Sequence, residues 1–152
     1  MNFDTQRRRL LSFSLASGLA GLLAFHTGGA IAQSKAADKP NKVVFQVSDA
    51  DPAKWNLALN NARNVQKDLG ADKVSLEIVA YGPGIGMLKM DSTVGSRVSE
   101  ALASGMSVVA CENTMNAQKL SRADMLTSIG YVPAGVVQLM QRQQQGYAYI
   151  RP

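Results

Sequence analysis

The sequence predicts an α/β protein, a three-layer α/β/α sandwich around a mainly parallel five-stranded sheet. Five short runs of β-branched and aromatic residues alternate with segments of helical periodicity. Strands that alternate with helices in this way pair in parallel through crossover connections. The first runs are almost continuously apolar, which is typical of strands covered on both faces. We find no internal repeat, so a single domain is expected.

The first 32 residues have the pattern of an export signal. Three arginines at 7–9 precede an apolar run at 10–25, and Ala30, Ile31 and Ala32 form a small-x-small cleavage site. The arginines and the two leucines after them resemble the twin-arginine signal, although Gln6 replaces the usual Ser or Thr. We therefore expect a periplasmic protein cleaved near Ala32, through the twin-arginine or the general secretory route. An uncleaved anchor is the alternative.

Cleavage after Ala32 would remove the only histidine, His26, and leave Cys111 as the only cysteine. A Ser-His-Asp triad, a Cys-His pair, histidine-based metal ligation and an internal disulfide are then excluded within one mature chain. We expect no cofactor and no metal. Residues 33–41 are polar and predict a disordered leader, so the domain is expected at 42–152.

Charge argues against nucleic acid as a partner. The expected signal carries three Arg and one Asp, so its removal lowers the formal net charge from +5 to +3. No cluster of Lys and Arg remains to form a phosphate-binding surface. After cleavage we also expect no stable membrane span.

The first half of the domain begins with an expected strand at 42–48. Asp51 and Pro52 follow as N-cap and first helical residue, and apolar residues then recur every three or four positions. Gly70 ends this predicted helix as its C-cap, and the second strand is expected at 74–81.

In the second half, helices and strands continue to alternate. A helix is predicted from a cap at Asp91 or Ser92 to Gly105, followed by a strand at 108–111. A turn or helix capped by Asn113 or Thr114 then runs to Leu120, and a capping box at 121–124 opens a short helix that reaches Met125, Leu126 and Ile129. The last predicted elements are a strand at 131–133, a helix at 135–145 and a strand at 147–150.

A glycine-rich loop follows the second predicted strand and contains Gly82, Gly84 and Gly86. A dinucleotide fingerprint would need a third glycine where Met87 stands, and no Lys-Ser/Thr pair follows as in a P-loop. We interpret the loop as a tight turn that brings backbone close to a small ligand or to a pocket beside Cys111. A turn with no binding role is the alternative.

Cys111 ends an apolar strand, and Asn113 and Thr114, which are suited to capping a helix, follow it. Open α/β sheets place ligands at the carboxyl ends of their strands, and a helix N-terminus favours a thiolate. Glu112 would oppose a thiolate if its carboxylate faced the sulfur. A lone cysteine in an oxidising compartment favours a functional role; a buried, inert cysteine is the alternative.

Four segments of the chain resemble the DsrE/DsrF-like family, most closely its small single-domain YchN-like members. They are AYGPGI at 80–85, VACENTM at 109–115, GVV at 135–137 and GYAYI at 146–150. The resemblance implies a parallel-sheet α/β/α fold and homo-oligomers such as trimers or hexamers. For the best-understood relatives, which act in the cytoplasm, it implies a cysteine that carries sulfane sulfur as a persulfide. Cys111 occupies the matching position.

Two functions are therefore considered. In the first, Cys111 accepts a sulfur atom and passes it to a partner thiol, the loop glycines shape the pocket, and Asn113 and Thr114 bind the anionic sulfur. The donor and the acceptor must be other molecules because the chain has no second cysteine. In the second, the chain is a non-catalytic subunit that binds a small ligand or another exported protein. A redox sensor would need the same exposed thiol of low pKa as the first.

Overall fold

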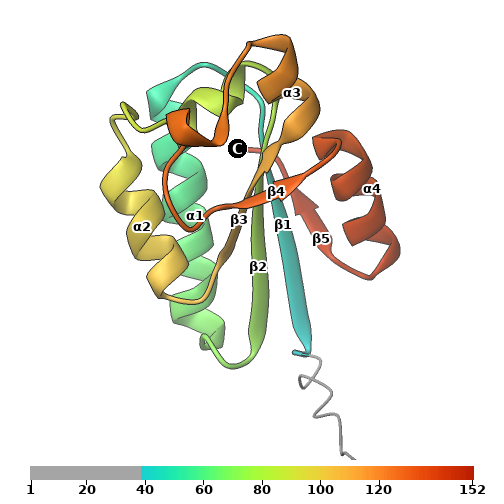
Figure 1. Ribbon diagram of the computed structural model, residues 1–152. Coiled ribbons are helices and arrows are strands. Elements are labelled where there is room, and N and C mark those ends of the chain that lie inside the picture. Colours follow the sequence, from blue (N-terminus) through green and yellow to red (C-terminus); the bar gives the residue numbers. More distant parts are fainter. Residues whose placement is uncertain (1–38) are drawn as a thin grey trace, which may run out of the picture. The chain divides into compact units, whose positions relative to one another are not determined.

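The computed structural model describes residues 39–152, and the expected export signal lies outside the described residues. The elements follow one another as β1 (Asn41–Val47), α1 (Pro52–Leu69), β2 (Val74–Ala80), the 3₁₀ helix η1 (Gly82–Leu88), α2 (Gly95–Ala103), β3 (Ser107–Cys111), α3 (Glu112–Ala117), the 3₁₀ helix η2 (Arg122–Asp124), β4 (Gly130–Val132), α4 (Gly135–Gln144) and β5 (Ala148–Ile150) (Figure 1).

The five strands form one sheet in the order β4-β3-β2-β1-β5, and every neighbouring pair is parallel. The predicted five-stranded sheet is confirmed, and among residues 39–152 it is entirely rather than mainly parallel. Because the strands are parallel, all five carboxyl ends lie at one edge of the sheet, next to α3 in Figure 1. Side chains that follow different strands in the sequence therefore meet there.

Helices cover both faces of the sheet, which confirms the three layers (Figure 1). Alternate strand residues point to opposite faces. Phe45, Ile78 and Val108 face α1 and α2 in the larger core, which also holds Trp55. The smaller core, under α4, consists of Val44, Val79, Val109 and Leu139. Full burial of such a side chain contributes about 1.5–3 kcal/mol.

The first helix follows its sequence signals closely. The Asp51 carboxylate accepts a hydrogen bond from the Ala53 amide at 2.8 Å, Pro52 is the first helical residue, and Gly70 ends the helix at a φ of 92°. The domain begins slightly earlier than expected. The Lys39 ammonium donates to the carbonyls of Ala71 and Val74, so part of the expected leader packs on the domain.

Two predicted caps are wrong. The N-cap of α2 is Val94, because the chain from Ser92 to Gly95 first closes a turn, with the Gly95 amide 3.1 Å from the Ser92 carbonyl. The N-cap of α3 is Cys111 itself, because that helix starts directly where β3 ends. Asn113 and Thr114 therefore lie inside the first turn of α3 rather than before it.

The capping box of Ser121 and Asp124 is confirmed, with both the hydroxyl and the amide of Ser121 2.7 Å from the Asp124 carboxylate. The helix that it opens is shorter than expected and ends at Asp124, because Met125 leaves it in extended conformation and is buried. Among residues 39–152, no helix is long and apolar enough to cross a membrane.

Candidate functional site

Cys111 lies at the carboxyl edge of the sheet, as the last residue of β3 and the N-cap of α3. Its side chain is buried, and 5% of the residue is exposed. The thiol is therefore enclosed rather than open to solvent. Whether it is an inert core residue depends on the groups that surround it.

The sulfur faces the α4 side of the sheet. Val109 packs in the smaller core under α4, and Cys111 follows it by two residues on the same face. Ala80 pairs with Ala110, so Tyr81 follows beside Cys111 on the neighbouring strand. The thiol lies 3.9 Å from the carbonyl oxygen of Pro133, just before α4 begins.

Hydrogen-bond donors surround the sulfur. Burial raises the pKa of the Cys111 thiol, but the Thr114 hydroxyl and the amides of Gly135, Thr114 and Asn113 outweigh burial and lower this pKa below its ordinary value. Gly135 is the first residue of α4, so amides from the first turns of both α3 and α4 contribute to the lowered pKa of this thiol. The site stabilises a thiolate, which a purely apolar environment would not do.

The Thr114 hydroxyl links the sulfur to the glycine loop. Its oxygen accepts a hydrogen bond from the Gly82 amide at 2.9 Å, which leaves the hydroxyl proton to point at Cys111. Gly82 has a φ of 52°, a conformation that glycine adopts more readily than other residues. Gln118, one turn after Thr114 at the C-cap of α3, donates to the Gly82 carbonyl at 3.3 Å. Three of the predicted site residues, Gly82, Cys111 and Thr114, thus meet.

The other predicted residues are placed differently. A Cβ atom on Gly84 would overlap the backbone carbonyl of Val47, and one on Gly86 would lie 3.1 Å from the Trp55 ring. These two glycines let η1 pack closely on β1 and α1, away from the sulfur. The side chain of Asn113 is exposed, and its backbone amide donates to the Pro133 carbonyl at 3.1 Å.

Glu112 does not leave an unbalanced charge beside the thiol. Its carboxylate forms a 3.0 Å ion pair with Arg122, whose guanidinium lies 4.4 Å from the centre of the Tyr131 ring. Within residues 39–152, no three His, Cys, Asp or Glu side chains gather into a metal site.

The sequence analysis did not identify the buried carboxylate of Glu77, which holds α4 on the sheet. Glu77 on β2 is 2% exposed, and both its oxygens are used. One accepts from Arg142 at 2.5 and 3.0 Å, and the other accepts from Gln138 at 2.6 Å. Because Gly135 begins the same helix, these contacts also fix its amide against Cys111. The available signal was a glutamate inside the apolar run of β2.

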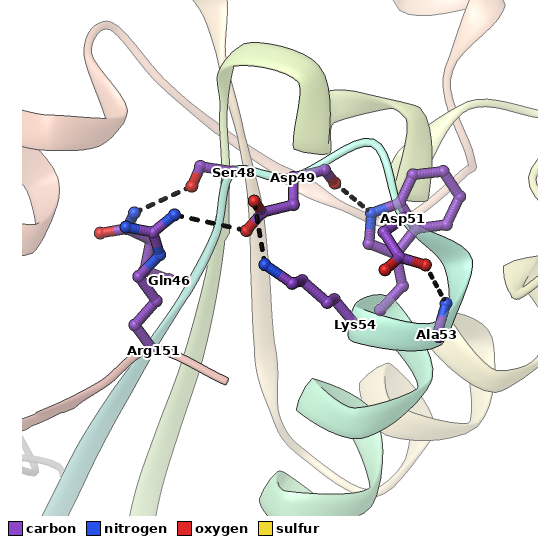
Figure 2. A network of polar contacts seen from close by, with 8 residues as sticks. Gln46, Ser48, Asp49, Asp51, Ala53, Lys54 and Arg151 are labelled. Atoms are coloured by element: carbon purple, nitrogen blue, oxygen red, sulfur yellow. Dashed lines mark hydrogen bonds and ion pairs between the residues drawn. The ribbon is translucent and has the colours of Figure 1, made fainter.

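A second polar network lies at the carboxyl end of β1 (Figure 2). Gln46 donates to the Ser48 hydroxyl at 2.9 Å and accepts from the Tyr149 hydroxyl at 2.5 Å. Burial is the main reason that the pKa of Tyr81 is raised, so its phenol stays neutral. Gln46 and Tyr149 from β1 and β5, with Ser48 and Tyr81 just after β1 and β2, therefore form a polar cluster at this edge, beside the charged pair of Asp49 and Arg151.

Asp49 joins the start of α1 to the end of the chain. Its carboxylate pairs with Lys54 at 3.1 Å and with Arg151 at 3.5 Å, and its backbone carbonyl accepts from the Trp55 indole at 2.7 Å (Figure 2). The hydrogen bond from Lys54 is the main cause of the lowered pKa of this exposed carboxyl. These contacts hold the segment after β5 at the carboxyl edge of the sheet.

Residues 39–152 form one α/β domain with a thiol at the carboxyl edge of its parallel sheet. The sequence profile of the DsrE/DsrF-like family matches residues 41–152, and the chain belongs to this family. The match begins where β1 begins, so it covers the whole sheet and the Cys111 site.

Comparison with solved structures agrees with the family. A protein of unknown function from Methanobacterium thermoautotrophicum, MTH1491, is 37% identical, with a TM-score of 0.70 over 74% of this chain and 99% of that chain. The protein BT1422 of unknown function from Bacteroides thetaiotaomicron is 18% identical, with a TM-score of 0.61 over 74% and 95%. The ychN protein from E. coli is 12% identical, with a TM-score of 0.58 over 74% and 99%. The last two show likeness of fold alone. A comparison with curated proteins gave no match.

The lowered pKa of Cys111 predicts a pH-dependent contribution to stability. Since the thiol ionises at lower pH in the folded chain, the unfolded chain binds more protons between the folded and unfolded pKa values. Ionisation of Cys111 should therefore increase the free energy of unfolding. This contribution is complete above the pKa of the thiol in the unfolded chain, and it is lost as the pH falls through the pKa of the thiol in the folded chain. Denaturant unfolding of the parent and of Cys111→Ser over a pH series measures it. Equal pH slopes for the two proteins would contradict the prediction.

Proposed function

We propose that this protein is an exported sulfur carrier that holds sulfane sulfur as a persulfide on Cys111. The observation that carries the proposal is the set of donors around the sulfur: the Thr114 hydroxyl and amides from the first turns of α3 and α4. Export is proposed from the arginines and the apolar run of residues 1–32, which lie outside the described structure.

The proposed loading step is an exchange between sulfur atoms. The Cys111 thiolate attacks the terminal sulfur of a donor persulfide, R–S–SH; the new Cys111–S bond forms, the donor S–S bond breaks, and R–S⁻ leaves. In delivery, an acceptor thiolate attacks the terminal sulfur of the Cys111 persulfide and Cys111 leaves as a thiolate. No external oxidant or reductant is consumed. A lowered pKa favours delivery, because a thiol of lower pKa is the better leaving group.

The burial of Cys111 defines where its partners must enter. The segment from Pro133 to Gly135 lies over the sulfur, with the Pro133 carbonyl and the Gly135 amide in contact with it. We propose that this short connection between β4 and α4 moves aside to admit the donor and the acceptor. The polar side chains of Gln46, Ser48 and Tyr149, with the Asp49–Arg151 ion pair beside them, then lie beyond Tyr81 for the rest of the donor.

The test is intact-protein mass spectrometry after incubation with polysulfide. Because Cys111 is the only cysteine of the chain, we expect a gain of sulfur that dithiothreitol removes and that Cys111→Ser does not show. A Cys111 that never gains sulfur, in a folded protein, would contradict the carrier function. If Cys111→Ser also retained all binding to a partner, the non-catalytic subunit would be the better account.

We also propose that the chain forms homo-oligomers such as trimers or hexamers. The support is the outer face of α4, where three apolar side chains are exposed: Val136, Val137 and Met140, at 61%, 44% and 50%. Light scattering of the protein after size-exclusion chromatography gives the mass directly. A monomer at all concentrations would contradict the proposal.

A further inference from the structure

A pocket of about 280 Å³ lies between α1 and α2, on the opposite face of the sheet from Cys111. Its floor is apolar and buried, and its rim is polar. The floor is formed by Leu59, Ala101 and Met106, and the rim by Arg63, Gln66, Arg97, Glu100 and Ser104. The volume is close to the lower limit of small-molecule sites. Neither the carrier function nor the family assignment uses this pocket.

Arg97 of α2 is held in one orientation without being neutralised. Its two terminal nitrogens donate to the side-chain oxygens of Asn56 and Asn60, the second at 2.6 Å. These acceptors are neutral amides one turn apart on α1. Within the part of the chain that the structure describes, no carboxylate forms an ion pair with Arg97. A guanidinium has five N–H groups, so three remain for a ligand after the two asparagines are satisfied.

Arg63 supplies a second positive charge at the same pocket. It lies one turn beyond Asn60 on α1 and has no hydrogen bond or ion pair with any residue of 39–152. Glu100 is the one carboxylate among the lining residues, and it is likewise in no ion pair within the described chain. The rim therefore has an excess of positive charge, and the Glu100 carboxylate is available to accept a hydrogen bond from a ligand.

A purely structural clamp between the two helices explains only part of this arrangement. The bonds from Arg97 to α1, and the 2.8 Å bond from Gln66 to the Ser104 carbonyl, do join α1 to α2. A clamp has no need of a second arginine or of an open volume above an apolar floor. An oriented guanidinium group without a carboxylate partner, such as that of Arg97, is suited to binding phosphate or carboxylate.

We propose that this pocket binds a small zwitterionic or hydroxylated organic anion. Its phosphate or carboxylate group binds between Arg63 and Arg97, its ammonium or hydroxyl group donates to Glu100, and its carbon atoms rest on the apolar floor. The site is independent of sulfur transfer at Cys111.

The test is isothermal titration of the full chain with two probes, O-phosphoserine and inorganic phosphate, at constant ionic strength. We expect saturable binding of O-phosphoserine that is tighter than that of inorganic phosphate, because only the former has an ammonium group for Glu100. Arg63→Gln and Arg97→Gln should each weaken O-phosphoserine binding about tenfold or more, the effect of losing a hydrogen bond to a charged group.

Arg122→Gln is the matched control, because that arginine pairs with Glu112 outside the pocket. It should leave the affinity unchanged, as should Cys111→Ser, which separates this site from the carrier function. Arg63 makes no contact that folding needs, so Arg63→Gln tests the site even if Arg97→Gln is unstable. Absence of saturable binding, equal affinity for the two probes, or full affinity in Arg63→Gln would each overturn the proposal.

Discussion

Replacement of Glu77 by alanine should destabilise the domain by about 3–5 kcal/mol, because it leaves the partly buried guanidinium of Arg142 without its carboxylate. The side chain of Glu77 is almost fully enclosed and accepts hydrogen bonds from both Arg142 and Gln138. Denaturant unfolding followed by circular dichroism measures the loss. Asp68→Ala, on the exposed surface of α1, is the matched control and should change stability little.

The three polar residues of this network can also be replaced together by apolar residues, so that none of them is left without a partner. A triple variant with Glu77→Leu, Gln138→Leu and Arg142→Met removes the charges and the amide at once, so no buried polar group loses its partner. Such replacements are often neutral or stabilising. The triple variant should therefore be more stable than Glu77→Ala. A Glu77→Ala protein as stable as the parent would show that the ion pair does not hold α4 on the sheet.

Thr114→Val should raise the pKa of Cys111, because the sulfur loses a hydroxyl donor while its burial is unchanged. A hydrogen bond to a charged group contributes about 1.5–3 kcal/mol, so the ratio of thiolate to thiol at a given pH below the pKa should fall about tenfold or more. The ultraviolet absorbance of the thiolate, followed over a pH titration, measures this ratio. Persulfide loading by polysulfide at neutral pH should slow in parallel.

Thr114→Ser is the control for this variant, because it keeps the hydroxyl that accepts from Gly82 and donates to the sulfur. Its titration should stay close to that of the parent. An unchanged titration in Thr114→Val would mean that the amides of α3 and α4 stabilise the thiolate without the hydroxyl. The proposed link between the glycine loop and Cys111 would then have no chemical role.

Local signals in the sequence predict the fold well. The apolar run of β1, the Asp51-Pro52 cap and the Gly70 stop each act within one turn or one strand, so neighbouring residues decide them. Neighbouring residues likewise determine that Cys111 lies between the end of a strand and the start of a helix. The start of α2 at Gly95 differs from the predicted one because the Ser92 hydroxyl accepts from the Val94 amide, at 3.4 Å, within a turn that precedes the helix.

The site itself depends on contacts between distant parts of the chain, which local patterns do not encode. Gly135 reaches Cys111 only because α4 packs beside β2, and that packing depends on Glu77, far away in sequence. Gly84 and Gly86 look like Gly82 in the sequence, yet they pack on Val47 and Trp55. The glycine content predicts a tight loop without showing which of its glycines lies beside the thiol.

The account depends on a thiol that is both ionised and reachable in the folded protein. The pH dependence of Cys111 alkylation by iodoacetamide, in the native and in the urea-unfolded chain, measures both properties at one atom. The account predicts that the native protein reacts, with a midpoint at lower pH than the unfolded chain. A native thiol that does not react at any pH at which the protein stays folded, or that reacts with a midpoint at or above that of the unfolded chain, would contradict it.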